Sequence, residues 1–483
     1  MKKFRIFPLI LILCLFFGAL APAADALGEP PLHSAKAVVL ADLSSGRLLY
    51  SKNADERRSP ASLTKVMTAL IAVEELESGR FSLDDMLTAQ PDCLAGLDTD
   101  SSTSGIQPGE TISYRDLLYC AMVHSANEAC NILAYHISGS VEAFVGRMNE
   151  RAAELGCVDT HFSDPNGLSN ENHYTTAYEM YIITAEAITH PLFAELYSAK
   201  GYDMPATNIS QARSFSSSNA LITTESMYGD KYVYPYAVGG KTGFTQLAGY
   251  CLVSTAEKDD VRLLAVVMGC DGYLNSDITD YENFSDTIAL YDWAFENFAY
   301  RTAVSASEAV SRVRVDLTSE SDEYLNLRPR SDVVMLLPKD LEPSAIELRP
   351  EIYDELLVAP IEAGTTLGRA DILINGERCG SVELVNISEV PLAKSEFLRR
   401  NIRMTLAKPW VKLLIVLVVL LLGGYIALVV RYRVMRRRYL RRRREAAARR
   451  ARERARSYPP QYDSTQMYSS FDGRGRSDER ENR

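Results

Sequence analysis

An uncharged apolar run near the C-terminus constrains this chain more than any other feature. Leu413–Val430 gives 18 consecutive positions without a charge, enough for a helix across a bilayer. Trp410 and Lys412 precede the run, and five of the eight residues after it are arginine. A helix on the membrane surface is the alternative, but it would need a polar face. We therefore expect a spanning helix over 410–430, with residues 431–483 in the cytoplasm.

A second apolar run lies at the N-terminus. Three basic residues precede the apolar stretch 6–20, and Ala21-Pro22-Ala23 fits a cleavage site. This pattern predicts a signal peptide over 1–23, with an uncleaved anchor as the alternative. The two runs together place the intervening chain outside the cell membrane.

Charge divides along the same boundary. Residues 431–483 hold 18 lysines and arginines against 7 acidic residues, a net charge of +11 that leaves −22 for the rest. A basic segment beside a membrane favours anionic lipid as its partner over nucleic acid. The last part, 457–483, is polar and is expected to be disordered.

The cysteines and histidines indicate no metal or cofactor. Seven cysteines remain after the signal peptide, an odd number, and several lie in apolar patterns. We expect most of them to be buried free thiols. No C-x-x-C or H-E-x-x-H occurs. His161 and Asp164 are possible ligands, but the Pro165-Asn166-Gly167 sequence favours a turn there.

The most informative chemical pattern is Ser62-Leu-Thr-Lys65, which opens the apolar-periodic stretch 66–76 before Gly79. Residues three apart share a helix face, so the Ser62 hydroxyl and the Lys65 amine are expected side by side. A serine becomes nucleophilic when a base takes its proton, and burial or a nearby cation adapts lysine to that task. A first-turn position also favours developing negative charge. The motif alone is weak, because it also occurs on solvated helices.

A second motif, Ser125-Ala126-Asn127, lies between two apolar helical patterns. In a structural interpretation, Ser125 caps the second helix and Glu128 completes a capping box. In a functional one, a buried turn presents a proton-relaying hydroxyl and an amide that positions Lys65 and substrate. His124, beside this motif, is assigned to packing or to a supporting role behind the site residues.

The third motif is Gly239–Gly243, with Lys241 and Thr242 between its glycines. It begins a series of three predicted strands, continued by 249–256 and 261–269. Glycines within a strand often mark close approach of a ligand or another backbone. Lys241 and Thr242 offer a cation and a hydroxyl to a carboxylate, unless this is an ordinary solvated strand end.

In this order the motifs resemble the signature of the penicillin-recognising serine D,D-peptidases. Ala35–Glu74 resembles the opening of low-molecular-mass penicillin-binding proteins of the D-alanyl-D-alanine carboxypeptidase type. His161–Leu168 and Lys241–Ala256 are similar to further landmarks of that group. Ala359–Val385 resembles the C-terminal domain of the same carboxypeptidases.

This resemblance implies a serine-type D-Ala-D-Ala carboxypeptidase that trims peptidoglycan stem peptides and is acylated by β-lactam antibiotics. The implied catalytic residues are the nucleophile Ser62, the general base Lys65 and the proton relay Ser125. The implied substrate-binding residues are Asn127, Lys241, Thr242, Gly243 and Phe244. The backbone amides of Ser62 and Phe244 would form the oxyanion hole. Some relatives carry an arginine where this chain has 217–219, which contains none, although Arg213 is near.

Three alternatives remain open. A β-lactamase needs a base for deacylation, for which Glu171 is only a candidate. A D,D-endopeptidase or transpeptidase differs in leaving group or acceptor. A non-enzymatic penicillin-binding sensor belongs to another class, and the three intact motifs argue against it.

The expected fold is mixed α/β, with an antiparallel sheet flanked by helices over 32–300. Its first and last strands are expected to share that sheet, and helices are expected from Ala61, Tyr114 and Asn127. A small all-β domain over 301–395 follows as a stalk, with a linker over 396–409 before the membrane span.

Overall fold

The computed structural model describes residues 28–97, 101–168, 171–272, 280–319, 323–354 and 356–456. The predicted signal peptide and the predicted disordered end lie outside these residues.

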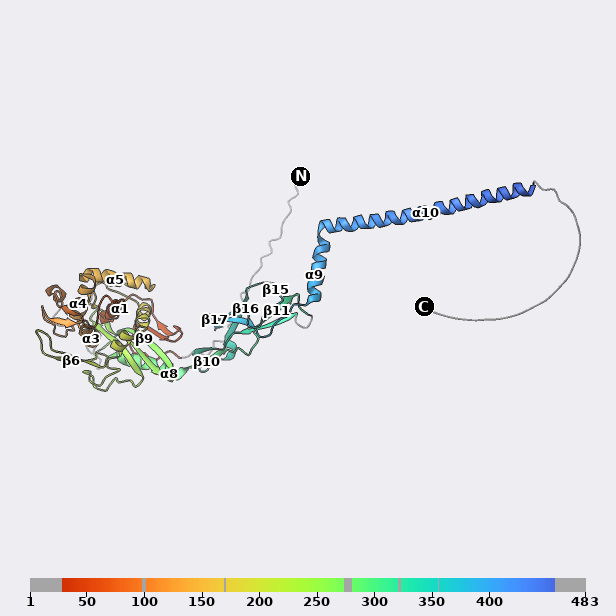
Figure 1. Ribbon diagram of the computed structural model, residues 1–483. Coiled ribbons are helices and arrows are strands. Elements are labelled where there is room, and N and C mark those ends of the chain that lie inside the picture. Colours follow the sequence, from red (N-terminus) through yellow and green to blue (C-terminus); the bar gives the residue numbers. More distant parts are fainter. Residues whose placement is uncertain are drawn as a thin grey trace, which may run out of the picture. The chain divides into compact units, whose positions relative to one another are not determined.

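A five-stranded antiparallel sheet forms the centre of the first domain (Figure 1). Its strands are β1 (Ala37–Asp42), β2 (Leu48–Lys52), β7 (Ala237–Thr245), β8 (Gly249–Lys258) and β9 (Val261–Cys270). The spatial order is β2-β1-β9-β8-β7, and Val38 of β1 pairs with Val267 of β9. This pairing confirms that the first and last strands share one sheet, and it leaves β7 at an edge.

Helices surround this sheet. They are the 3₁₀ turn η1 (Ala61–Thr64), α1 (Lys65–Glu77), α2 (Pro91–Leu94), α3 (Tyr114–Met122), α4 (Asn127–Ser138), α5 (Val141–Glu154), α6 (Ala177–Ala187), α7 (Pro191–Ser198) and α8 (Glu282–Asn297). Two small two-stranded antiparallel sheets pair β3 (Met86–Thr88) with β4 (Thr111–Ser113) and β5 (Gly201–Met204) with β6 (Arg213–Ser216). The expected starts at Tyr114 and Asn127 are confirmed, and the start at Ala61 is a 3₁₀ turn.

The sheet separates two hydrophobic cores. Successive strand side chains point to opposite faces, so Val39 packs with α1 and α3–α7 while Val38 and Leu40 pack with α8. Because both faces are covered, β1 is buried along its whole length. On the helical side β7 lies against η1 and α7, and its Phe244 packs against the core that contains α8.

A region of β structure follows. Its elements are β10 (Phe298–Val304), β11 (Ser311–Asp316), β12 (Tyr324–Pro329), β13 (Val333–Pro338), the 3₁₀ turn η3 (Pro343–Ala345), β14 (Ile346–Ile352), β15 (Leu357–Val358), β16 (Thr366–Ile374) and β17 (Glu377–Asn386). One sheet has the order β14-β16-β17-β12-β11-β15, and β10 pairs with β13. Asn375 and Gly376, both at positive φ, form the turn between β16 and β17. The expected all-β character is therefore confirmed.

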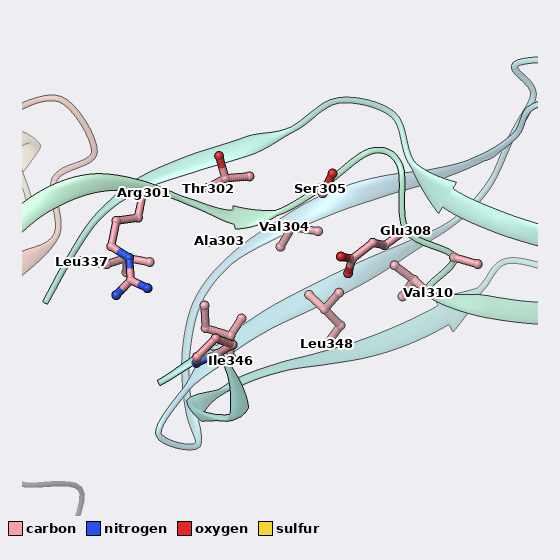
Figure 2. Close-up of a pocket in the computed structure, with 12 residues that line it drawn as sticks. Arg301, Thr302, Ala303, Val304, Ser305, Glu308, Val310, Leu337, Ile346 and Leu348 are labelled. Carbon is pink, nitrogen blue, oxygen red and sulfur yellow. The ribbon is translucent and has the colours of Figure 1, made fainter. Parts of the chain in front are cut away.

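A cavity of about 570 Å³ opens beside β10, β13 and β14, with Ile346 and Leu348 among its apolar walls (Figure 2). Arg301 also lines it, but its guanidinium is used by the backbone. Its Nη1 donates at 2.8, 3.3 and 2.9 Å to the carbonyl oxygens of Pro338, Lys339 and Leu341.

The C-terminal helices α9 (Lys394–Ala407) and α10 (Pro409–Arg456) belong to a second compact unit. α9 occupies the predicted linker, so that segment is helical, and its Arg400 pairs with Asp316 at 3.2 Å. α10 contains a stretch long and apolar enough to cross a bilayer, and none of that stretch is buried in the protein. This apolar helix suggests membrane anchoring.

Candidate active site

Ser62 and Lys65 meet where η1 passes into α1. Ser62 lies within the 3₁₀ turn and Lys65 is the first residue of the α-helix, so Ser62 precedes the helix rather than occupying its first turn. The Lys65 ammonium nitrogen lies 2.7 Å from the Ser62 hydroxyl oxygen. The predicted pairing of hydroxyl and amine is therefore present in the structure.

Lys65 is enclosed by protein. Its side chain has no exposed surface, and Nζ also donates to the Asn166 carbonyl oxygen at 2.6 Å. Burial lowers the pKa of Lys65 to about 8, against the opposing charges of Cys130, Asp164 and Glu128. A neutral lysine is consequently accessible near neutral pH, as a general base requires.

A tight turn holds the Asn166 carbonyl on Lys65. One Asp164 carboxylate oxygen accepts the backbone N–H groups of Asn166, Gly167 and Leu168 at 2.9, 2.5 and 3.2 Å. Gly167 has φ +89°, and a Cβ there would lie 1.9 Å from the Ala61 carbonyl oxygen. The turn predicted from the sequence thus packs directly against the nucleophile segment.

Ser125 lies in a strained turn between α3 and α4, with φ +63°. The capping-box interpretation is wrong, because Ala126 is the N-cap residue of α4. The Glu128 carboxylate instead accepts the hydroxyls of Thr103 and Ser104 at 2.7 and 3.1 Å and the Ser104 N–H at 2.6 Å. Ser125 is therefore released from capping and turned toward β7.

Lys241 on β7 reaches across to that hydroxyl. Its Nζ donates to the Ser125 hydroxyl oxygen at 3.0 Å and to the Thr242 carbonyl oxygen at 2.9 Å. Lys241 has no exposed surface, and burial, together with the positive charge of Lys65, lowers its pKa. The three motifs accordingly meet in one place, although Lys241 lies beneath the surface.

The glycine at position 243 is explained by the close approach of the η1 backbone to β7. A Cβ on Gly243 would lie 3.0 Å from the Pro60 carbonyl oxygen and 3.1 Å from the Ser62 backbone nitrogen. The predicted proximity of another backbone is confirmed, and it brings β7 against η1. The backbone N–H groups of Ser62 and Phe244 therefore lie on neighbouring segments.

These segments enclose a cleft of about 320 Å³. The described lining residues are Ser62, Ser101, Ser102, His124, Ser125, Asn127, Gly167, Leu168, Ser218, Tyr228, Thr242, Gly243, Phe244, Thr245, Tyr250, Asn283 and Phe284. Six of the eight predicted site residues are among them, and Lys65 and Lys241 lie buried behind. Ser218 shares a 2.7 Å hydrogen bond with Thr242, a partner that the sequence did not single out.

The nearby histidine and arginine have structural partners. His124 lines the cleft, but it bonds the Thr103 carbonyl at 3.1 Å and packs 4.6 Å from the Phe215 ring. Burial lowers the pKa of His124. Arg213 is paired with the buried carboxylate of Glu110, so it is not a cleft cation.

Metal-ligating geometry appears elsewhere. Among the described residues, Glu74, Glu186 and His190 bring ligand atoms within 4.8 Å of one another. Arg151 already pairs with both carboxylates at 2.8 Å. His161 bonds the Asn172 carbonyl at 2.6 Å, and Asp164 serves the turn described above.

Comparisons with known families agree with this geometry. A family described as D-alanyl-D-alanine carboxypeptidase matches residues 24–272, and the penicillin-binding protein 5 C-terminal domain matches 298–392. The D-alanyl-D-alanine carboxypeptidase DacF of Bacillus subtilis is 29% identical over 368 residues, covering 76% of this chain and 87% of the relative. DacA of Haemophilus influenzae is 31% identical over 363 residues, covering 75% and 86%.

Solved structures give the same result. Penicillin-binding protein 5 from Haemophilus influenzae has a TM-score of 0.58 at 31% identity, covering 75% of this chain and 99% of that one. DacD from Francisella tularensis has a TM-score of 0.59 at 25% identity, covering 78% and 99%. With its motifs assembled in one cleft, the chain belongs to the D-alanyl-D-alanine carboxypeptidase family of serine peptidases, the low-molecular-mass penicillin-binding proteins.

Proposed function

We propose that this enzyme removes the terminal D-alanine from peptidoglycan stem pentapeptides through an acyl-enzyme on Ser62. The observation that carries the proposal is the 2.7 Å contact between the Ser62 hydroxyl and a fully buried lysine. Burial lowers the pKa of Lys65 to about 8, so a fraction of the neutral amine is present near neutral pH and can take the hydroxyl proton.

In the first step, the Ser62 oxygen attacks the carbonyl carbon between the two D-alanines as its proton passes to Lys65. The backbone N–H groups of Ser62 and Phe244 stabilise the resulting oxyanion; losing one such donor typically costs about 10²–10³-fold in rate. Asn127, which lines the cleft at the start of α4, orients the peptide.

In the second step, the C–N bond breaks and Ser125 gives its hydroxyl proton to the leaving amine while it takes up the proton that Lys65 received from Ser62. The Ser125 hydroxyl oxygen accepts a hydrogen bond from Lys241 at 3.0 Å. The hydroxyl's own proton therefore remains free to be donated to the leaving amine. Water then attacks the ester carbon, and one of its protons passes to the Ser62 oxygen as the ester bond breaks and the shortened peptide leaves.

The terminal carboxylate is assigned to the Thr242 end of the cleft. Thr242 and Ser218 share a hydrogen bond and both line the cleft, so they present hydroxyls to an anion. Lys241 supports this end from beneath Ser125 and Thr242 rather than from the cleft surface. A free C-terminus is the group that such donors distinguish from an internal peptide bond.

The β-lactamase alternative receives no support from Glu171. This residue is exposed and is not among the described residues that line the cleft. Endopeptidase activity differs only in the leaving group, and a cross-linked stem dimer tests for it directly.

We further propose that the catalytic domain faces outward and that α10 crosses the membrane with its basic end inside. Arginines follow the apolar stretch of α10 at once, which favours the cytoplasm for that side. The same arginines form a helical surface suited to anionic lipid headgroups. Proteolysis of a C-terminal tag in sealed protoplasts tests the orientation: the tag should survive until the membrane is opened.

The decisive experiment supplies the full-length protein in detergent with a free stem pentapeptide and measures D-alanine release. We expect the wild type to release one D-alanine and one tetrapeptide per turnover. The Ser62→Ala variant should release neither product. Penicillin should leave a persistent adduct on Ser62. Rapid penicillin turnover would favour a β-lactamase, and an inert wild type with normal folding would favour the sensor.

A further inference from the structure

The lining of the cleft determines how an anionic substrate end can be held. Among the described residues that line it there is no lysine or arginine, and Lys241 has no exposed surface. A desolvated carboxylate must nevertheless be satisfied by donors. Some further neutral donor is therefore needed beside Thr242 and Ser218.

The side of the sheet on which that donor must lie is defined by β7. Side chains alternate along the strand, and Lys241 and Gly243 face η1 and α4. Thr242 and Phe244 consequently point to the other face, where Phe244 packs in the core that contains α8. An anion on Thr242 would lie on the α8 side of the cleft.

Asn283 stands at the N-terminal turn of α8 on that side. It lines the cleft, is 2% exposed, and its Oδ1 has no hydrogen-bond partner among the described residues. A buried amide left unsatisfied is costly, so its presence beside a binding cleft indicates a ligand. Rotating the amide by half a turn exchanges Oδ1 and Nδ2, so this position can offer an N–H donor.

Two further features suit this position to a small anion. α8 is 16 residues long, and the positive end of its dipole lies at Asn283. Four aromatic residues line the same cleft and form an aromatic wall: the ring centroids of Tyr228 and Phe284 are 5.7 Å apart, and those of Tyr250 and Phe244 are 4.2 Å apart. Such an apolar surface suits a methyl-sized side chain.

We propose that Asn283 is a specificity-determining residue that donates its side-chain N–H to the terminal carboxylate of the leaving residue. This inference rests on the proposed function and adds a residue that none of the three motifs contains. The N-terminus of α8, Thr242 and Ser218 complete a cation-free carboxylate site. The leaving D-alanine places its methyl group against the aromatic wall.

The test compares two acyl-D-alanyl thioesters with the full-length protein in detergent. One leaving thiol carries a carboxylate and the other carries the corresponding carboxamide. Acylation of Ser62 breaks the C–S bond and releases the protonated thiol, whose appearance gives kcat/KM for each probe. We expect the wild type to prefer the carboxylate probe by about tenfold or more.

Four variants separate recognition from folding. Asn283→Leu should reduce the preference about tenfold, and Asn283→Asp should reduce it further by charge repulsion, with the carboxamide probe within about twofold of wild type. Asn297→Asp is the matched control, because it adds the same charge about 21 Å away on the same helix. Asn283→Ser is the mildest change, and it is used if the Asn283→Leu and Asn283→Asp proteins have a lowered melting temperature.

The outcomes are distinguishable. An unchanged preference, or an equal loss with both probes in every Asn283 variant, would overturn the role of Asn283. A wild type that acylates with both probes at equal rates would do the same while leaving acyl transfer intact. No Ser62 adduct from either probe would instead refute the proposed function.

Discussion

Two of the hollows in this protein, the β-domain cavity and the catalytic cleft, differ in size and in chemistry. The β-domain cavity is larger, at about 570 Å³ against about 320 Å³ for the catalytic cleft. Its cation, Arg301, is occupied by three backbone carbonyls. The cleft instead is lined by hydroxyls and amides, with two lysines buried behind them. The comparison teaches that polar groups positioned for a ligand identify a reactive site better than volume does.

The largest effect is expected when the nucleophile is removed from the catalytic cleft. We expect Ser62→Ala to lower acylation by penicillin by about 10⁴-fold or more, because no other group forms the ester. Labelled penicillin on the purified protein measures this, with unchanged thermal unfolding as the control. Residual labelling at the wild-type rate would place the reactive group elsewhere.

The second change acts on the turn behind Lys65. Gly167→Ala adds a Cβ that would lie 1.9 Å from the Ala61 carbonyl oxygen at a residue with φ +89°. Either Ala61 or the Asn166 carbonyl must move, so we expect roughly a hundredfold loss of acylation rate.

Gly156→Ala is the matched control for that prediction. Gly156 has φ +83°, but a Cβ there meets no atom within 4 Å. It should lower the melting temperature while leaving the acylation rate within about twofold. Equal kinetic effects of the two changes would mean that general strain, not the Lys65 contact, is responsible.

The third prediction concerns pH. The Lys65 pKa is lowered to about 8, so below that value the neutral base is the minor form and decreases as pH falls. Acylation by a β-lactam should rise roughly tenfold from about pH 6 to about pH 7 and level off above about pH 8. A flat profile between these values would exclude a titrating lysine as the base.

The smallest effect on activity is expected from the β-domain cavity. Arg301→Met removes the donor to three carbonyl oxygens, which should destabilise the β domain by about 1–3 kcal/mol. D-alanine release and penicillin acylation should remain within about twofold of wild type. A large loss of either would show that this cavity supports the cleft.

Much of the site was predictable from local spacing. Ser62 and Lys65 are three residues apart, and the glycines around Lys241 mark a strand approached by other backbone. The strand series β7–β9 was equally clear, because its apolar residues lie between tight turns. These features depend on neighbours in the chain, which a single sequence displays.

The remainder depended on contacts between distant segments. Lys65 donates to the backbone carbonyl oxygen of Asn166, and the residue type at position 166 does not reveal the direction in which that carbonyl points. Ser125 was ambiguous because a cap and a strained turn use the same residue type. β14 contains Pro350, which argues against a strand unless that strand is at an edge, as it is here.

The edge position of β7 has one more consequence. The edge strand of a sheet has unpaired backbone N–H and C=O groups, which can pair with an extended segment of another chain and lead to aggregation. Here Pro60 and Ser62 lie against the face of β7 at Gly243 and leave the hydrogen-bonding edge of the strand uncovered by that contact. We therefore expect an extended peptide to pair with β7 through its backbone while its carbonyl group lies beside the Ser62 hydroxyl.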